Sequence, residues 1–441
     1  MRSAIRRLWP LLSLLLLGGC VSAVQPLPPP SATTPAQPPA AAAPAATATA
    51  TARAGQRPPL LLVSIDGFRA DYLQRGLTPT LAAMATSGVR AQAMQPSFPS
   101  LTFPNHYTLV TGLYPDHHGI VNNTMYDPKL GKFSLGIRSA VSDGRWWSEG
   151  EPIWVTADKH GLQTATMFWP GSGAEIHGWR PDHWLPFDDS VTASQRVDQV
   201  LQWLDLPDGQ RPDFLTLYFD AVDHAGHEYG PDTPQLDASL RHVDAALARL
   251  LAGLKARGLY HHMNILVVAD HGMAATPSGN LVLMDKVINL DHVRVVSMGV
   301  LAGFIPKPGY AGQVAATLLQ PHPHMRCWRK SHFPARLHYG SNPRVPPLNC
   351  LANVGWQITS SDYLAHRTRP MSLGQHGYDN AAPLMRALFV AHGPAFRKGL
   401  VVPEFPNVDV YPLMTHLLGI PAQPNDGNFA TVAPMLLEGR E

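Results

Sequence analysis

The chain has 441 residues, of which 45% are hydrophobic and 15% charged, and its formal net charge is +2. This composition excludes an intrinsically disordered chain and is typical of a globular protein with one large domain or two. The near-neutral charge gives no global attraction for nucleic acid, so we expect no binding to nucleic-acid polymers.

The N-terminal stretch MRSAIRRLWPLLSLLLLGGC combines arginines with a short apolar run, which predicts a signal peptide over residues 1–19. The run is too short to span a bilayer as a stable helix. Its end resembles the lipobox of bacterial lipoproteins, so we expect cleavage before Cys20 and lipidation of that cysteine. The alternative is an ordinary secretory signal cut near Ala23. Both interpretations export the protein, and the first predicts a bacterial lipoprotein in the periplasm or anchored to the outer membrane through Cys20.

Residues 20–57 are almost all Pro, Ala, Thr, Ser and Gln, which predicts an extended tether without a core. A catalytic domain is predicted over residues 58–441. Apolar runs bounded by turn residues predict buried strands over 58–68, 211–224, 262–272 and 382–394. Helices are predicted over 78–88, 233–258 and 408–420. Strands alternating with helices indicate an α/β fold with a doubly wound, mainly parallel sheet sandwiched by helices.

The alternation weakens between about residues 300 and 365, where Pro, His and Arg are frequent. We expect a small insertion subdomain in this segment. Cys327 and Cys350 are the two cysteines that remain if Cys20 is lipidated, and in an exported protein such a pair favours a disulfide.

Three of the predicted strands end in carboxylates: Asp66, then Asp220 or Asp223, then Asp270. Histidines accompany two of these ends, and His376 lies between glycines in GQHGYDN. Ligand sites of open α/β sheets gather at the carboxyl ends of the strands. Imidazoles together with carboxylates suit zinc and similar transition metals, so the pattern predicts a metal site at this edge of the sheet.

One ambiguity remains within DAVDHAGHEYGP. Asp220 with His224, and Asp223 with His227, are both spaced i,i+4 and could each chelate an ion from one helical turn. Spacing alone does not choose between the two pairs.

Five separated motifs together resemble the nucleotide pyrophosphatase/phosphodiesterase family of the alkaline phosphatase superfamily. They occur in the family's order and the resemblance covers residues 58–441. It implies an alkaline phosphatase-like α/β sandwich with two zinc ions at the strand ends. The motifs are VSIDGFRADYL, PSFPSLTFPNHYTLVTGLYPDHHGIVNN, LYFDAVDHAGHEYGP, VVADHGM and QHGYDN.

The resemblance implies a ligand set, residue by residue. Asp223, His227 and His376 would bind one zinc, and Asp66, Asp270 and His271 the other, together with the nucleophile Thr102. Asn123 resembles the family's asparagine that contacts a phosphate oxygen. By the same alignment Asp220 and His224 are not ligands. The family's usual Glu-Pro-Asp is Ala221-Val222-Asp223 here, which keeps the ligand.

A hydroxyl bound to zinc needs no side-chain base, so His106, four residues from Thr102, need not activate it. We expect attack by Thr102, a covalent phospho-threonine and then its hydrolysis. A helix is expected to start near Thr102, so that the main-chain N–H of Phe103 and the helix dipole favour the phosphate. DHHG at 116–119 is expected to be a solvated loop outside the site.

The predicted substrate preference rests on aromatic residues. Phe103 is expected to stack on a nucleobase. The segment FWPGSGAEIHGWRPDHW resembles the family's nucleotide pocket, with Trp184 as a second wall unless it is a core or surface aromatic. Tyr218 is also assigned to substrate binding. Nucleotide pyrophosphates and phosphodiesters are the expected substrates and nucleoside monophosphates the products.

Three alternatives stay open at this point. A phosphomonoesterase or a choline or lysophospholipid phosphodiesterase of the same superfamily would use the same two-zinc site. A lipid-anchored binding protein with a dead site would have lost ligands or the nucleophile, and none is missing here.

Overall fold

A central sheet of eight strands organises the computed structural model, which describes residues 57–437. The predicted signal peptide, the lipidation of Cys20 and the tether up to residue 56 lie outside the described residues. The strand order is β19-β2-β18-β9-β1-β8-β6-β7. The bounds are β1 Leu60–Ile65, β2 Val89–Ala91, β6 Thr164–Met167, β7 His183–Trp184, β8 Phe214–Phe219, β9 Asn264–Val268, β18 Phe389–His392 and β19 Leu400–Val402.

The sheet is mainly parallel, as predicted. β1 pairs in parallel with β8 on one side and with β9 on the other, whereas β18 pairs antiparallel with both of its neighbours. Every residue of β1, β8 and β9 is buried. Strands covered on both faces need apolar side chains on both, which explains their unbroken apolar runs.

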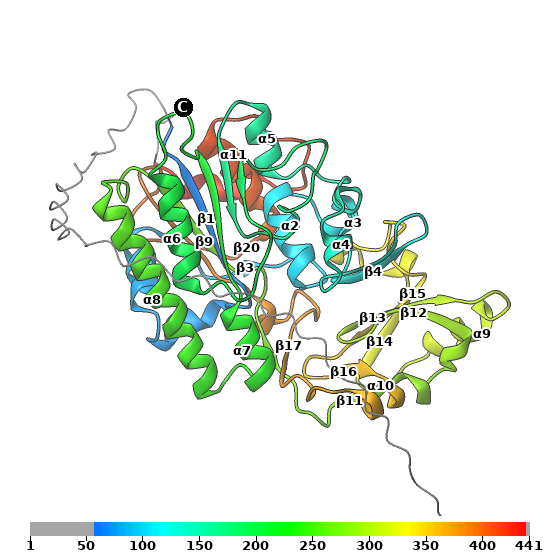
Figure 1. Ribbon diagram of the computed structural model, residues 1–441. Coiled ribbons are helices and arrows are strands. Elements are labelled where there is room, and N and C mark those ends of the chain that lie inside the picture. The colour runs from blue at the N-terminus through cyan, green and yellow to red at the C-terminus, as the bar shows by residue number, and fades with distance from the viewer. Residues whose placement is uncertain (1–56, 438–441) are drawn as a thin grey trace, which may run out of the picture. The chain divides into compact units, whose positions relative to one another are not determined.

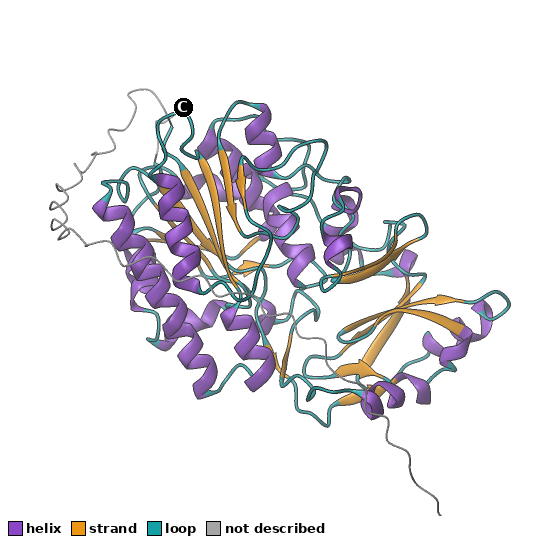
Figure 2. Ribbon diagram, viewed as in Figure 1, coloured by secondary structure: helices purple, strands orange, loops and turns teal. Residues whose placement is uncertain are grey.

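Helices cover both faces of this sheet (Figures 1 and 2). In Figure 1, α6 and α8 lie on one side of the sheet, and α2, α5 and α11 lie on the other. The bounds of the helices that pack around the sheet are α1 Pro79–Ser87, α2 Thr102–Thr111, α5 Ile153–Lys159, α6 Ala193–Leu204, α7 Ala221–Tyr229, α8 Pro234–Ala256 and α11 Val410–Leu418. The fold class predicted from the sequence is therefore confirmed.

The longest of these helices, α8, shows why the sequence folds in this way. Thr233 caps it by accepting the N–H of Leu236, and Pro234 occupies its first position. Six apolar residues at helical spacing form its buried stripe, and they are Leu236, Leu240, Val243, Leu247, Leu250 and Leu254.

A separate antiparallel sheet occupies the segment for which the sequence predicts a subdomain. Its order is β12-β13-β15-β14, with β12 Val293–Ser297, β13 Leu301–Pro306, β14 Met325–Arg329 and β15 Leu348–Ala352. Helix α9, Ala311–Leu318, packs against β14 and β15. Cys327 and Cys350 lie opposite each other on β14 and β15 and form a disulfide.

Short elements complete the described chain. The remaining strands form pairs: β3 Met94–Gln95 with β20 Phe405–Pro406, β4 Thr124–Asp127 with β5 Gly131–Ser134, β10 Ala274–Ala275 with β17 Gly374–Gln375, and β11 Leu281–Leu283 with β16 Gln357–Thr359. The other α-helices are α3 Pro115–His118, α4 Arg138–Val141, α10 Ser361–His366 and α12 Phe429–Val432. The 3-10 turns are η1 Ala70–Arg75, η2 Gly144–Trp146, η3 Met284–Lys286, η4 Leu290–His292, η5 Lys330–His332, η6 Ala335–Leu337, η7 Pro383–Met385, η8 Asn407–Asp409 and η9 Ala433–Met435. Between residues 57 and 437, none of the helices has the length and apolar character needed to cross a membrane.

Candidate active site

The carboxyl ends of three adjacent strands bring acidic side chains to one edge of the central sheet. Asp66 directly follows β1, Asp220 directly follows β8, and Asp270 comes two residues after the end of β9. The backbone N–H of Asp66 donates to the carbonyl of Phe219 at 2.9 Å, which extends the pairing of β1 and β8 to this point. The sheet topology thus places residues from distant parts of the chain side by side.

Asp66, Asp270 and His271 form the first group of candidate metal ligands. Their ligand atoms lie within 4.8 Å of one another, and all three side chains are buried. His271 Nε2 is 3.4 Å from Asp66 Oδ1 and 3.0 Å from Asp270 Oδ2. The hydroxyl of Thr102 lies 3.3 Å from the same His271 nitrogen. The first group therefore adjoins the expected nucleophile.

The second group joins the first through His271. Ligand atoms of Asp223, His271 and His376 lie within 4.8 Å of one another. His227 Nε2 adds to this group, at 3.4 Å from Asp223 Oδ2 and 3.2 Å from His376 Nε2. The rings of His271 and His376 stack with centroids 3.5 Å apart. The structure therefore brings together all seven residues that the family resemblance assigns to metal binding.

The ambiguity within helix α7 is settled by the direction of the side chains. Asp223 and His227 point to the second group, whereas the Asp220 carboxylate binds the guanidinium of Arg196 at 3.0 Å. His224 is exposed and belongs to neither group. Asp220 and His224 are therefore not ligand candidates.

A glycine allows α7 to approach the end of β1. Gly67 has a φ of +68°, and a Cβ built on it would lie 3.0 Å from the Cα of Asp223. A side chain at this position would be strained and would press on Asp223.

Donor chemistry at the cluster fits metal ions. One oxygen each of Asp66, Asp223 and Asp270 is buried without a hydrogen-bond partner. Buried carboxylate oxygens left unpaired are costly, and a cation held between them removes that cost. Carboxylate and imidazole ligands in this mixture suit zinc.

The histidines are oriented as metal-binding histidines are. Nδ1 of His227 lies 2.8 Å from the carbonyl of Gly374, that of His376 2.9 Å from Ser100 O, and that of His271 2.9 Å from Gly272 O. A carbonyl only accepts, so each Nδ1 carries the proton and each Nε2 lone pair faces the cluster. This arrangement fixes the tautomer that a ligand needs.

The buried carboxylates and imidazoles of the cluster shift one another's pKa values. Burial, with the nearby charges of Asp270 and Asp223, raises the pKa of Asp66 well above its ordinary value. Burial and the facing imidazoles of His271 and His227 lower the pKa of His376 well below its ordinary value, which keeps that ring neutral. Burial alone would raise the pKa of Asp270, but the imidazoles of His271 and His106 hold it well below its ordinary value.

Thr102 is the first residue of α2, as expected, and its helix has no side-chain N-cap. The predicted use of the Phe103 N–H is wrong for this structure, because that N–H donates to Asn123 Oδ1 at 2.9 Å. Since the backbone group can only donate, the Asn123 amide must turn its oxygen toward Phe103. Its Nδ2 is thereby left facing away from Phe103, and it makes no hydrogen bond within the described residues.

The aromatic residues expected to bind substrate take different places. Phe103 is half-buried and packs against Phe133 and Trp147, with ring centroids 5.9 Å away in each case. Trp184, on β7, is also half-buried, with the guanidinium of Arg180 5.2 Å from its ring. Within residues 57–437, the rings of Phe103 and Trp184 do not contact each other.

Tyr218 was predicted to bind substrate, and the structure gives it a different contact. The side chain is buried, and its hydroxyl donates to Asp66 Oδ2 at 2.6 Å. Tyr218 therefore orients a candidate metal ligand. Phe187, which the sequence analysis did not single out, is 48% exposed and makes edge contacts with Tyr218 and Phe168.

The expectation that DHHG at 116–119 is a solvated loop is also wrong. The Asp116 carboxylate accepts the N–H groups of three consecutive residues, 340–342. His118 is fully buried beside the Thr108 hydroxyl, and burial lowers its pKa to about 3. The motif lies outside the site, as expected, but it fastens the chain before Asn123 to the loop that precedes β15.

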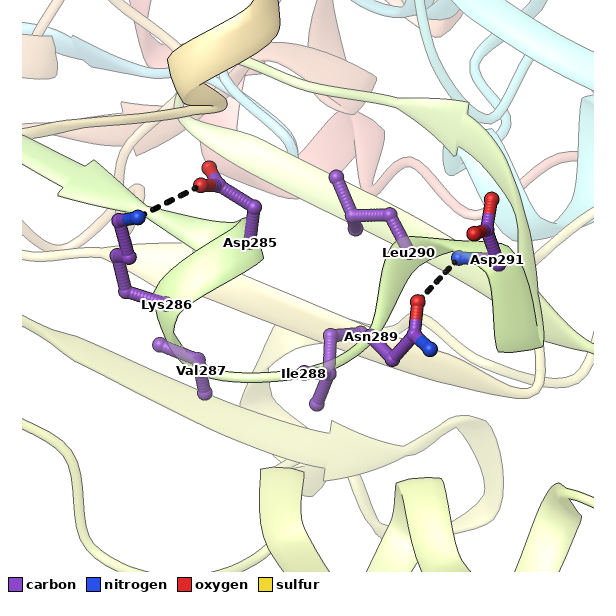
Figure 3. A pocket seen from close by; sticks show the side chains of 7 residues that line it. All are labelled: Asp285, Lys286, Val287, Ile288, Asn289, Leu290 and Asp291. Atoms are coloured by element: carbon purple, nitrogen blue, oxygen red, sulfur yellow. Dashed lines mark hydrogen bonds and ion pairs between the residues drawn. The ribbon is translucent and has the colours of Figure 1, made fainter.

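A shallow hollow of ≈ 490 Å³ lies elsewhere (Figure 3) and is lined by consecutive residues, 285–291. Figure 3 shows Lys286 near Asp285, and Asn289 accepting the N–H of Asp291. None of the candidate metal ligands borders this hollow. The candidate site is therefore defined by its converging side chains and not by this hollow.

Comparisons with known proteins point to one family. The model of the type I phosphodiesterase/nucleotide pyrophosphatase family matches residues 60–379. An uncharacterized pyrophosphatase/phosphodiesterase of Schizosaccharomyces pombe is 40% identical over 387 residues, which is 85% of this chain and 80% of the relative. Human ectonucleotide pyrophosphatase/phosphodiesterase family member 1 is 37% identical over 86% of this chain, but the match spans only 42% of that longer protein.

A solved structure agrees with these matches. Murine ectonucleotide pyrophosphatase/phosphodiesterase 5, as an inactive threonine-to-alanine variant in complex with AMP, superposes with a TM-score of 0.82 at 35% identity. The superposition covers 87% of this chain and all of that chain.

Proposed function

Because the chain belongs to the type I phosphodiesterase/nucleotide pyrophosphatase family, we propose that it is a two-zinc hydrolase of nucleotide pyrophosphates and phosphodiesters. It releases nucleoside monophosphates through a covalent phospho-Thr102. The observation that carries this proposal is the convergence of two adjoining ligand groups on one threonine hydroxyl.

Asp66, Asp270 and His271 would hold one zinc, and Asp223, His227 and His376 the other. When bound, the two ions would lower the pKa of the attacking hydroxyl and stabilise the leaving oxygen. The unpaired carboxylate oxygens and the outward-facing Nε2 lone pairs support this assignment.

The residues of the chain then divide the remaining work. Thr102 gives up its hydroxyl proton to solvent, and its Oγ1 forms a bond to phosphorus while the bond from phosphorus to the leaving oxygen breaks. Asn123 Nδ2 and the N–H of Thr102 would donate to a phosphate oxygen, because the Phe103 N–H is taken by Asn123 Oδ1 and Pro104 has none. A water molecule then adds its oxygen to phosphorus as the bond from phosphorus to Thr102 Oγ1 breaks, and a proton from that water restores the hydroxyl.

Nucleotides are the proposed substrate class. The solved relative binds AMP, and its inactive form carries a threonine-to-alanine change. In this chain Phe103, Trp184 and Phe187 expose part of their aromatic surface and could stack on a base.

Comparison of a diester with a monoester tests the proposal. Zinc-loaded protein should hydrolyse bis-p-nitrophenyl phosphate faster than p-nitrophenyl phosphate, and a faster monoester reaction would favour a phosphomonoesterase. The rates on a panel of ATP, NAD, UDP-glucose and glycerophosphocholine then decide between nucleotides and choline phosphodiesters as the substrate class. Preference for glycerophosphocholine would contradict the nucleotide assignment.

We also propose export, with a lipid on Cys20, a tether over residues 20–57 and a catalytic domain over residues 58–441. The support is the composition of the N-terminal segment. Incorporation of labelled palmitate that is lost in Cys20→Ser would agree with this, and an unlabelled, processed wild-type chain would contradict it.

A further inference from the structure

A buried histidine lies one helical turn after the expected nucleophile on α2. His106 follows Thr102 by one helical turn on α2, and its side chain is fully buried. Its Nδ1 is 2.9 Å from the carbonyl oxygen of Thr102 and 3.3 Å from Asp270 Oδ2. Its Nε2 is 2.8 Å from the hydroxyl of Ser64. One imidazole thus contacts three segments of the chain.

The partners of His106 fix its proton. The Thr102 carbonyl can only accept, so Nδ1 carries a hydrogen that it donates to that oxygen, while the Asp270 carboxylate lies 3.3 Å from the same nitrogen. The Ser64 hydroxyl lies 2.8 Å from Nε2, so both ring nitrogens have a partner. Rings of Trp169 and Tyr218 meet it at their edges, with centroids 4.9 and 5.3 Å away, and hold its plane.

This geometry does not suit a general base. The Thr102 hydroxyl lies near His271, at 3.3 Å, and makes no hydrogen bond with His106 among the described residues. The nitrogen of His106 that could accept a proton faces Ser64, inside β1. His106 contacts the backbone of the nucleophile and not its reacting atom.

We propose that His106 is a positioning residue that ties the start of α2 to the end of β9 and so fixes Thr102 relative to Asp270. The inference rests on the proposed function, in which Thr102 is the nucleophile and Asp270 a metal ligand. Misplacement of a reacting atom by about 1 Å can cost about 10²-fold in rate, so one imidazole that holds the backbone of Thr102 near Asp270 can matter.

Two amide replacements separate the two nitrogens of the ring. His106→Asn keeps a donor near the place of Nδ1, whereas His106→Gln extends its amide toward the place of Nε2. We expect His106→Asn to keep kcat for bis-p-nitrophenyl phosphate within about tenfold of wild type. His106→Gln should lower kcat by about 10²-fold with little change in KM. Ser64→Ala, which leaves Nδ1 untouched, should lower kcat less than His106→Gln does.

The metal content of each variant makes the result specific. Both His106 variants should bind as many zinc ions per chain as wild type. Loss of zinc in His106→Gln would show that the residue maintains the fold of the metal site, and this would overturn the proposal. Wild-type kcat in His106→Gln would overturn it, and so would equal losses of kcat in the two variants with zinc retained.

Ring nitrogen spectra test the same inference without activity. In protein labelled with ¹⁵N at the histidine rings, the resonances lost in His106→Asn should report a proton on Nδ1. An Nδ1 without a proton would contradict the proposal even if the protein hydrolyses no diester. An inactive wild-type protein that carries this proton would instead overturn the proposed function alone.

Discussion

Asp66, Asp223 and Asp270 each have one buried carboxylate oxygen without a hydrogen-bond partner within the described residues. Sequence spacing left two i,i+4 pairs on α7 as equal candidates, and only the direction of the side chains separates them. Asp220 is held by Arg196, whereas the Asp223 carboxylate faces His227. The distinction is therefore testable at two neighbouring carboxylates of the same helical segment.

Asp223→Asn should reduce the zinc content from about two ions per chain to about one, because it removes a charged ligand from one group only. Asp220→Asn is the matched control and should keep both ions. The measurement is metal analysis of both proteins after dialysis against trace zinc. Loss of an ion from Asp220→Asn, or full retention in Asp223→Asn, would show that the ligands are misassigned.

Away from the site, Asp158 predicts a pH effect on stability. Burial, together with the neighbouring Asp182 carboxylate, raises the pKa of Asp158 to about 7. The folded chain therefore binds more protons at this residue than the unfolded chain between about pH 4 and pH 7. This contribution is fully present below the unfolded pKa and is lost as the pH rises through the folded pKa.

Asp158→Asn should remove that dependence, since the amide keeps an acceptor for the Thr164 hydroxyl, which donates to Asp158 at 2.6 Å. The free energy of unfolding of the variant, minus that of wild type, should therefore increase as the pH is raised from 5 to 8, as measured by urea denaturation. Asp182→Asn should shift stability in the same direction. A variant that differs from wild type by the same amount at both pH values would contradict the raised pKa.

At the scale of elements, sequence reasoning was accurate where one force dominated. β1, β8 and β9 are unbroken apolar runs because both faces are buried, and α8 has an apolar stripe and an N-cap. It missed β2, β6, β7 and β19, which have between two and four residues each. Such strands are too short for a periodic pattern and depend on neighbours that pair with them.

The direction of β18 was not predicted either. It pairs antiparallel with both β9 and β2, although its apolar composition matches that of the parallel strands. Composition reports the burial of a strand, whereas its direction depends on the path of the chain that leads into it.

The disulfide of the antiparallel sheet predicts a measurable loss of stability. It joins β14 to β15 across a sequence separation of 23 residues. Closing a loop of this length lowers the conformational entropy of the unfolded chain, which destabilises the unfolded state by about 3 kcal/mol. Changing Cys327 and Cys350 together to serine should lower the free energy of unfolding by about this amount. Reductant should lower the free energy of unfolding of wild type and leave that of the double variant unchanged. A wild-type free energy of unfolding that does not respond to reductant would contradict the stabilising role of the disulfide.

For the molecule as a whole, the resemblance of separated motifs identified the residues that the structure brings together at the strand ends. It could not reveal how those residues are held. The bond from Phe103 to Asn123, the hydroxyl of Tyr218 on Asp66 and the burial of His118 all depend on side-chain directions. These directions are set by tertiary packing, for which a single sequence carries no local signal.

The central claim is that Thr102 forms the covalent intermediate at a site assembled by the two ligand groups. The most direct measurement is hydrolysis of bis-p-nitrophenyl phosphate by wild type and by Thr102→Ala at equal zinc content. We expect steady turnover by wild type and none by Thr102→Ala, although that variant keeps both zinc ions. Turnover by zinc-loaded Thr102→Ala at the wild-type rate would contradict the account.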